Sequence, residues 1–512
     1  MKKQKSIFMR LLDRVEKIGN ALPHPVTLFL VFCGMVIIAS QIFSMLGTSV
    51  TYEVIDPATH ETTMTTVSAV SLLSADGLRF IFTSAVSNFT SFAPLGTVLV
   101  AMLGVGVAEG TGFIGTVLRK LVLSTPKTFI TVVVVLAGVV SNVASDAGYV
   151  VLIPLGAIIF ASVGRHPLAG LAAAFAGVSG GYSANLIIGS TDPLLAGIST
   201  EAAQLFDPNY VVGAASNFYF MFVSSFLIAI LGTFVTEKIV EPRLGKYNGP
   251  QIEAVEHLND NEKRGVKYAV IAFIIFVLVI LLMLIPQNGI LRNQENGEIL
   301  NGSPFMSALV FIMALAFLIP GIAYGIGAKS IKSDKDVVAA MSKSMSSMGS
   351  YIVLTFVASQ FVAYFNYTKL GTIIAVKGAD ALKSAGIGGI GLILLFVLLT
   401  AFINLFMGSA SAKWAIMAPI FIPMLMKSGF APEFTQVAYR IGDSTTNIIS
   451  PLMSYFALIV TFAGKYDEES GIGTLISTMV PYSIVFLIGW SLLLIVWYIF
   501  GWPIGPGASI LM

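Results

Sequence analysis

Residues 129–160 read FITVVVVLAGVVSNVASDAGYVVLIPLGAIIF, two apolar arms separated by the polar break SNVASDAG at 141–148. A helix needs about 20 apolar residues to cross the hydrocarbon core of a bilayer, and each arm is shorter than that. Lys127 precedes the segment and Arg165 follows it, and Lys and Arg accumulate in cytoplasmic loops. The pattern therefore predicts a re-entrant helical hairpin that opens to the cytoplasm.

The composition of the whole chain places this hairpin in a membrane protein. Of the 512 residues, 56% are hydrophobic and only 11% are charged, whereas a soluble domain carries about 25% charged residues. We expect an all-α integral membrane protein, because apolar stretches of spanning length recur along the chain. The net charge of +2 gives no indication of a nucleic-acid partner.

The positions of Lys and Arg orient the predicted spans. Basic residues precede residue 26, so we expect the N-terminus inside the cell and the uncharged C-terminus outside. About nine transmembrane helices accompany two hairpins, and the predicted spans are 26–46, 88–108, 167–199, 211–235, 268–285, 305–326, 351–365, 434–462 and 477–500. Loop residues expected in the cytoplasm are Lys120, His166, Lys238 and Lys335, and those expected outside are Thr59 and Asn296.

A second interrupted apolar block, broken at 408–413, predicts a second hairpin that opens to the outside. Pro154 corresponds to Pro419, and downstream of these prolines, with a shift of three residues, GYSANLI at 181–187 corresponds to DSTTNII at 443–449, which pairs Asn185 with Asn447. Broken helices at matching places in two halves of opposite orientation are typical of inverted-repeat secondary transporters. The predicted parts are a cytoplasmic segment (1–25), a first half (26–236) with hairpin 1 (127–164), a cytoplasmic loop (237–267) and a second half (268–512) with hairpin 2 (386–427).

The polar breaks carry the oxygen ligands that an alkali cation prefers. Unwound backbone within a membrane is tolerated around a cavity or a bound ion, and carbonyl, amide, hydroxyl and carboxylate oxygens suit hard cations. Two candidate sodium sites follow, one made by Asn142, Ser145, Asp146 and Asn185 and its mirror made by Asn404, Ser409, Ser411 and Asn447. The alternative is that these groups only bond to one another and hold the hairpins in place.

Charged residues inside the apolar segments are candidates for function by default. Arg440 and Asp443 are three residues apart and are expected to pair, either as a substrate site or as a structural salt bridge. Asp192 has no cation near it in sequence, which favours ligand binding or protonation. Trp414 either stacks on an aromatic ligand or anchors at the membrane interface, and Lys413 is expected to extend to water.

Sequence patterns for catalysis and for metal binding are missing. The chain has one cysteine and four histidines without ligand spacing, and no Ser/His/Asp, His-Glu-x-x-His or phosphate-loop pattern. We therefore expect no enzyme and no cofactor, with Na⁺ or H⁺ as the coupling ion of a transporter. A channel, or a membrane enzyme acting on a lipid-linked substrate, stays open as an alternative.

Long motifs spread along the chain resemble those of the AbgT family of bacterial transporters. They are RVEKIGNALPHPVTLFL (14–30), NFTSFAPLG (88–96), GRHPLAGLAAAFAGVSGGYSANLII (164–188), TDPLLAGISTEAA (191–203), EPRLG (241–245), IPQNGILR (285–292) and PIGPG (503–507). The resemblance implies the fold of the ion-transporter superfamily with two re-entrant hairpins, and homodimers of nine-span protomers in the bacterial cytoplasmic membrane.

The resemblance also implies a substrate. Family members transport p-aminobenzoyl-glutamate, and some export sulfonamides. The family's functional positions match here as Asp192, Ser411, Trp414, Arg440, Asp443 and Pro451. Lys413 departs from the family pattern, which leads us to expect an apolar residue before the tryptophan, and this added charge bears on ligand preference. Arg440 suits a glutamyl carboxylate, Trp414 an aromatic ring, and Asp192 or Asp443 an arylamine or a coupling proton.

Overall fold

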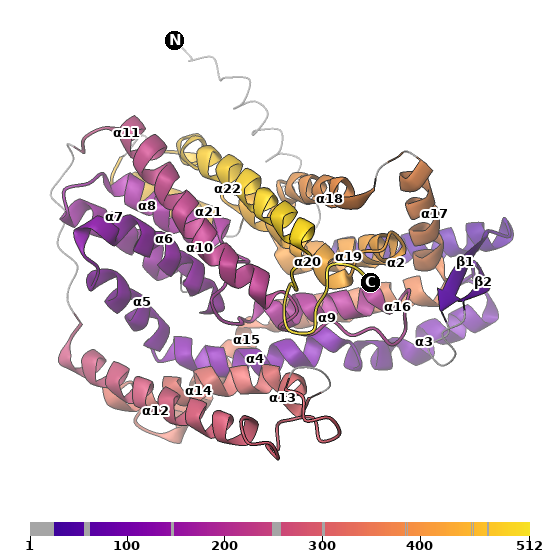
Figure 1. Ribbon diagram of the computed structural model, residues 1–512, viewed down its shortest axis with the longest axis horizontal. Coiled ribbons are helices and arrows are strands. Elements are labelled where there is room, and N and C mark those ends of the chain that lie inside the picture. The colour runs from indigo at the N-terminus through magenta and orange to yellow at the C-terminus, as the bar shows by residue number, and fades with distance from the viewer. Residues whose placement is uncertain are drawn as a thin grey trace, which may run out of the picture.

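The chain is mostly helical, as Figure 1 shows. The computed structural model describes residues 25–55, 62–144, 148–247, 258–299, 303–384, 386, 388–451, 453, 455–467 and 470–512. The expected cytoplasmic segment before residue 25, the expected external residue Thr59 and the candidate ion ligands Ser145 and Asp146 lie outside these described residues.

The elements of the first half run from α2 to α11. They are α2 (Pro25–Met45), β1 (Ser49–Ile55), β2 (Thr62–Ser68), α3 (Ala75–Thr90), α4 (Ala93–Gly110), α5 (Phe113–Leu123), η1 (Lys127–Phe129), α6 (Ile130–Ser141), η2 (Asn142–Ala144), η3 (Gly148–Leu152), α7 (Ile153–Ser162), α8 (Pro167–Phe175), η4 (Ala176–Gly180), α9 (Thr191–Ala203), α10 (Phe218–Val235), η5 (Thr236–Val240) and α11 (Glu241–Leu244).

The second half begins with a long helix whose first residues lie inside the expected 237–267 loop. Its elements are α12 (Asp260–Leu284), α13 (Pro304–Ser307), α14 (Leu309–Ala328), α15 (Asp334–Ser347), α16 (Gly349–Tyr367), α17 (Leu370–Ser384), α18 (Gly389–Asn404), α19 (Ala410–Lys427), α20 (Pro432–Asn447), α21 (Phe456–Gly464) and α22 (Ile472–Phe500).

Several of these helices are suited to crossing a membrane. Six helices within the described residues are long and apolar enough, and the number rises to eight if each of two bent helix pairs is one span. One bent pair joins α5 to η1 and α6 at an angle of 116°. The chain is therefore a multi-pass helical membrane protein, while the count of nine spans, the two re-entrant hairpins and the inverted repeat stay predictions.

Two segments expected to be external loop have regular structure. Strands β1 and β2 form an antiparallel hairpin with Ser49 opposite Ser68, so the expectation of an all-helical protein is wrong at this point. The strands are rich in Thr and Val, which favour the extended backbone, and Thr51 Oγ1 lies 2.9 Å from Thr66 Oγ1 across the pair. Helix α3 begins at Ala75, after a cap in which Ser74 Oγ accepts the Gly77 N–H.

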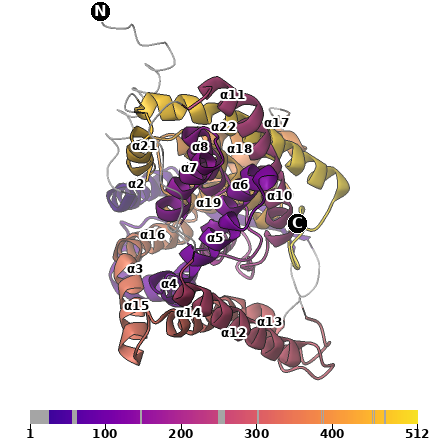
Figure 2. The same cartoon turned by 90° about the vertical axis from the view of Figure 1, so that its left-hand side faces the viewer.

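Helix α4 lies between two groups of helices, one formed by α12 and α14 and the other by the broken helices. Figures 1 and 2 show α12 and α14 side by side along one edge of the molecule, with α4 against α14. A Cβ at Gly104 of α4 would lie 1.9 Å from the Ala314 backbone oxygen, so the two backbones touch, as small residues allow in membranes. On its other side, α4 packs against α9, which belongs to the region of the broken helices.

Besides the breaks at 141–148 and 408–413, polar runs at 180–193 and 442–447 are expected to interrupt the predicted spans 167–199 and 434–462. Three of these four runs end or start helices. Helix α6 ends at Ser141, before the break in the first hairpin. Helix α18 ends at Asn404 and α19 begins at Ala410. Between η4 and α9, residues 181–190 are not helical.

The fourth break lies later in the chain than predicted. Helix α20 continues through 442–447 and ends at Asn447, so the expectation that this polar run interrupts the helix is wrong. The Thr445 and Thr446 hydroxyls donate to the carbonyls of Ile441 and Gly442 at 2.8 and 2.9 Å. These bonds satisfy the hydroxyls within the helix, and the helix ends directly after the polar run, before Pro451.

Candidate substrate pocket and ion site

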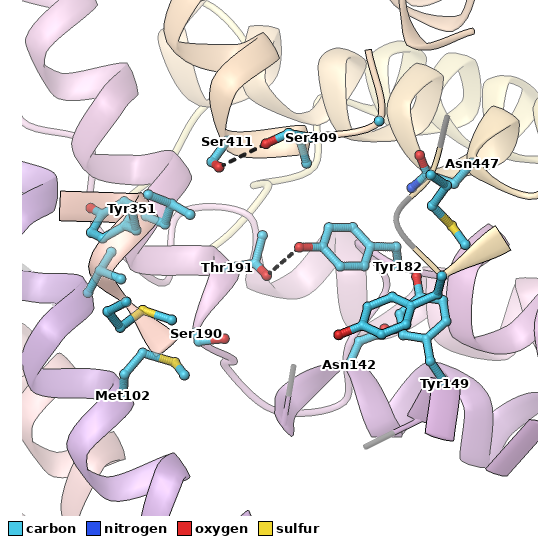
Figure 3. Close-up of a pocket in the computed structure, with 17 residues that line it drawn as sticks. Met102, Asn142, Tyr149, Tyr182, Ser190, Thr191, Tyr351, Ser409, Ser411 and Asn447 are labelled. Atoms are coloured by element: carbon cyan, nitrogen blue, oxygen red, sulfur yellow. Dashed lines mark hydrogen bonds between the residues drawn. The ribbon is translucent and has the colours of Figure 1, made fainter. Parts of the chain in front are cut away.

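A cavity of about 320 Å³ lies where the ends of the broken segments meet α4 and α16, as Figure 3 shows. It is lined by Val98, Met102, Asn142, Tyr149, Tyr182, Ser190, Thr191, Leu194, Met348, Tyr351, Gly408, Ser409, Ala410, Ser411, Asn447, Met453 and Tyr455. Its volume is within the range of small-molecule sites, about 300–1,000 Å³. Among the described residues that line it, none is charged.

Two helix N-termini face this cavity. Helix α9 begins at Thr191 and α19 begins at Ala410, and both residues line the wall. Ser409 caps α19, because its hydroxyl accepts the Ala412 N–H at 3.3 Å, and it lies 3.4 Å from the Ser411 hydroxyl. Free backbone N–H groups and the helix dipole make such ends suitable for anions, so the cavity can bind a carboxylate without a charged side chain.

Aromatic side chains form another part of the wall. Tyr149 and Tyr455 stack with ring centroids 4.5 Å apart and an interplanar angle of 13°. Tyr182 receives a hydrogen bond from the Thr191 hydroxyl at 3.3 Å (Figure 3), and the Tyr351 hydroxyl donates to the backbone oxygen of Pro94 at 2.8 Å. The cavity therefore combines aromatic surface with anion-binding helix ends.

An ion pair between α20 and α9 lies behind the cavity. Arg440 Nη2 is 2.6 Å from Asp192 Oδ1 and 3.1 Å from the Ser183 backbone oxygen. The expected pair of Arg440 with Asp443 is therefore wrong, and Asp192, which has no cation near it in sequence, has Arg440 as its partner in the fold. Residues three apart on a helix can pair, but α9 brings the Asp192 carboxylate to the Arg440 guanidinium, and Asp443 pairs with another cation.

Asp443 pairs instead with Lys413 of α19. Lys413 Nζ donates to Asp443 Oδ1 and to Asn404 Oδ1, and the lysine side chain is fully buried. The expectation that Lys413 extends to water is wrong, because its side chain reaches Asn404 of α18 and Asp443 of α20. A buried ammonium needs such oxygen partners.

Trp414 is fully buried and does not line the cavity. Its indole N–H donates to Ser199 Oγ at 3.0 Å, and its ring stacks on Tyr439 with centroids 4.3 Å apart. Ser199 in turn donates to Gln436 at 2.6 Å, and Gln436 donates to Asn217 at 2.7 Å. Trp414 thus anchors a polar network in the interior.

Asn217 and Gln436 were missed by sequence reasoning. No sequence motif marks either residue. The fold brings them together with Ser199 of α9 into one hydrogen-bond network. Asn217 Oδ1 also accepts from Arg440 Nη1 at 3.4 Å. The tyrosines of the cavity wall were missed as well, since tyrosine is common in membrane helices.

The two sets of candidate ion ligands differ in their hydrogen bonding. Asn142 Nδ2 donates to the backbone oxygens of Gly138 and Gly181, each at 3.4 Å. Asn142 Oδ1, Ser183 Oγ and both amide atoms of Asn185 are buried, and no hydrogen-bond partner for them lies in the described part of the chain. Buried polar atoms are nearly always paired, so these oxygens are candidates for binding a cation.

In the second set of candidate ion ligands, both polar atoms of the Asn404 amide have hydrogen-bond partners. Asn404 Nδ2 lies 2.7 Å from the backbone oxygen of Asp443, 2.9 Å from Thr446 Oγ1 and 2.8 Å from Asn447 Oδ1, so its two N–H groups are shared among three acceptors. Ser409 and Ser411 lie apart from this cluster, in the wall of the cavity. The structure therefore divides the predicted mirror site into a buried cluster around Asn404 and a hydroxyl pair that faces the cavity.

The broken membrane helices, the cavity at their ends and the buried ion pairs around it define a membrane transporter. The AbgT putative transporter family model matches residues 10–512, and the chain belongs to this family. It is 39% identical over 498 residues to the p-aminobenzoyl-glutamate transport protein of Escherichia coli (strain K12), with 97% of this chain and 96% of that protein covered. As its relatives are transport proteins, the chain is a transporter and not an enzyme.

Two solved structures share the fold. The YdaH transporter of Alcanivorax borkumensis superposes with a TM-score of 0.89 at 47% identity, over 94% of this chain and 100% of that one. MtrF of Neisseria gonorrhoeae, described as illuminating a class of antimetabolite efflux pumps, superposes with a TM-score of 0.91 at 51% identity, over 98% and 100%. The resemblance inferred from the motifs is confirmed.

Proposed function

We propose that this chain is an ion-coupled secondary transporter of p-aminobenzoyl-glutamate and related aryl-amine compounds in the bacterial cytoplasmic membrane. The observation that carries the proposal is the cavity at the ends of the broken segments, which offers two helix N-termini and several tyrosines. A benzoyl-glutamate has carboxylates for the former and an aromatic ring for the latter. The name of the Escherichia coli relative agrees with this substrate, and the description of MtrF makes sulfonamide-type antimetabolites a second group of candidates.

The proposed substrate contacts are made at the N-terminus of α19. Ser411 lines the cavity and is assigned a direct hydrogen bond to substrate. Arg440 and Asp192 are assigned the positioning of α9, because their ion pair holds the first turn of that helix next to the wall residue Thr191. Asp443 and Trp414 are assigned the positioning of α19 at the other wall of the cavity. Pro451 is assigned the turn that directs the chain away from α20.

We propose sodium as the coupling ion, because several buried oxygens have no hydrogen-bond partner among the described residues. Asn142 Oδ1, Asn185 Oδ1 and Ser183 Oγ are neutral oxygen ligands without hydrogen-bond partners among the described residues, as suits an alkali cation. Asn142 also lines the cavity, so a sodium ion bound there would lie beside the substrate. This proximity supports coupling, because each ligand then strengthens binding of the other.

The proposed arrangement in the membrane has the N-terminus inside, the C-terminus outside and two protomers per transporter. Movement of the broken-helix region along α4 and α16 would expose the cavity to either side in turn. The cavity lies between these two regions, which supports such a motion.

Counterflow of labelled p-aminobenzoyl-glutamate in proteoliposomes tests the proposal. Preloaded vesicles should accumulate label, and an inward sodium gradient at constant pH should increase uptake above the outside concentration. A channel would only equilibrate the label, so uptake that never exceeds equilibrium contradicts secondary transport. Uptake that follows an imposed pH gradient and ignores sodium would assign coupling to protons.

A further inference from the structure

One hydrogen bond occurs at corresponding positions in the two hairpins. Asn142 Nδ2 donates to the backbone oxygen of Gly181 at 3.4 Å, and Asn404 Nδ2 donates to that of Asp443 at 2.7 Å. In both cases the acceptor lies 39 residues further along the chain. Each asparagine stands where the first arm of its hairpin ends, immediately after α6 and at the last residue of α18.

A second asparagine completes each position. Asn447 follows Asn404 by 43 residues and accepts its amide N–H at 2.8 Å. Asn185 follows Asn142 by the same interval, and it is also buried. Both Asn142 and Asn447 line the cavity, so the two positions lie against one substrate pocket.

The two positions differ in whether the protein itself supplies a cation. In the first half, Asn142 Oδ1 and Asn185 Oδ1 have no hydrogen-bond partner within the described residues. In the second half, the Lys413 ammonium binds the corresponding Asn404 Oδ1. It also binds the carboxylate of Asp443, which stands where the first half has Gly181.

We infer that the Lys413 ammonium takes the place of a second sodium ion, so that the transporter binds one exchangeable ion in its first half and has a fixed cation in its second. An ammonium group and an alkali cation both require several oxygen ligands, and neither tolerates an apolar environment. The Asp443 carboxylate neutralises the lysine in the membrane interior. The inference rests on the proposed ion coupling, because it assigns the number of coupling ions.

Removal of the lysine should open a sodium site. We would compare thermal unfolding of N142A and of N142A/K413A in detergent, in sodium chloride and in choline chloride at equal ionic strength. The Asn142→Ala change removes the first-half site, so N142A should show no response specific to sodium. N142A/K413A should be less stable in choline, and its apparent Tm should rise with each tenfold increase in sodium concentration.

Asp443 provides the matched control. In N142A/K413A/D443N the carboxylate is gone, and the sodium response should be lost with it. An N142A/K413A protein that unfolds at the same temperature in both salts would overturn the inference while leaving transport by the wild type untouched. A sodium response that persists in N142A would overturn both this inference and the proposed first-half site.

The wild type offers a test that does not depend on the folding of a variant. With one exchangeable ion, the sodium dependence of p-aminobenzoyl-glutamate uptake should have a Hill coefficient of about 1, since the coefficient is limited by the number of sites. A coefficient clearly above that value would require a second bound sodium ion and would overturn the role assigned to Lys413.

Discussion

The pairing of Arg440 with Asp192 predicts a large coupling energy between two residues that are 248 positions apart in sequence. Their side chains are 1% and 9% exposed. Loss of one partner of such a buried pair costs about 3–5 kcal/mol. Arg440→Met leaves the Asp192 carboxylate with the Gly189 N–H, at 2.7 Å, as its one remaining hydrogen bond among the described residues, and the free energy of unfolding should fall by an amount in that range.

A double-mutant cycle isolates the interaction. We expect R440M/D192N to be more stable than the sum of the single changes predicts, with a coupling of about 2 kcal/mol, because directly contacting residues couple by roughly 0.5–3 kcal/mol. The matched control is the cycle between Arg440→Met and Asp443→Asn, which tests the neighbour on the same helix and should give a coupling below about 1 kcal/mol.

The assay is reversible unfolding of the purified variants in mixed detergent micelles, followed by tryptophan fluorescence. Trp414, one of four tryptophans in the chain, stacks on Tyr439 in the same region and contributes to this signal. A coupling for Arg440 with Asp443 that equals or exceeds the coupling with Asp192 would refute the pairing described here.

Three further predictions concern the ion, the orientation and the pocket. Asn142→Ala should abolish the sodium dependence of uptake. Asn404→Ala should keep it and lower stability, because the Asn404 amide donates to groups of α20 and accepts from Lys413. A loss of sodium dependence in both variants would contradict the difference between the halves. In a cysteine-free background, Asn296→Cys should react with an impermeant thiol reagent added outside cells and Lys238→Cys should not, and the reverse result would invert the topology. Ser411→Ala should weaken p-aminobenzoyl-glutamate binding, measured by calorimetry, by about 0.5–1.5 kcal/mol, and an unchanged affinity would remove Ser411 from the site.

The membrane class, most spans and both interrupted blocks could be predicted from the sequence, since they depend on local properties. A bilayer requires a continuous apolar stretch in each crossing helix, and that stretch is visible in the letters, as in Pro25–Met45 and Ile472–Phe500. The break between α18 and α19 was visible for the same reason, because polar residues interrupt an apolar run, although it lies at 405–409 and the helix resumes at Ala410, inside the predicted break at 408–413. The prediction of a break at 442–447 was wrong, because the Thr445 and Thr446 hydroxyls are hydrogen-bonded within the helix.

The sequence by itself also determined the family and the residue types of the site, through long motifs and through charges that are costly inside a membrane. Only the tertiary structure decided which charge meets which. Lys413 pairs with Asp443 and Arg440 with Asp192, because a buried charge takes the opposite charge that the packed helices bring to it. In both pairs the partner comes from another helix, so closeness in sequence does not decide which charges pair.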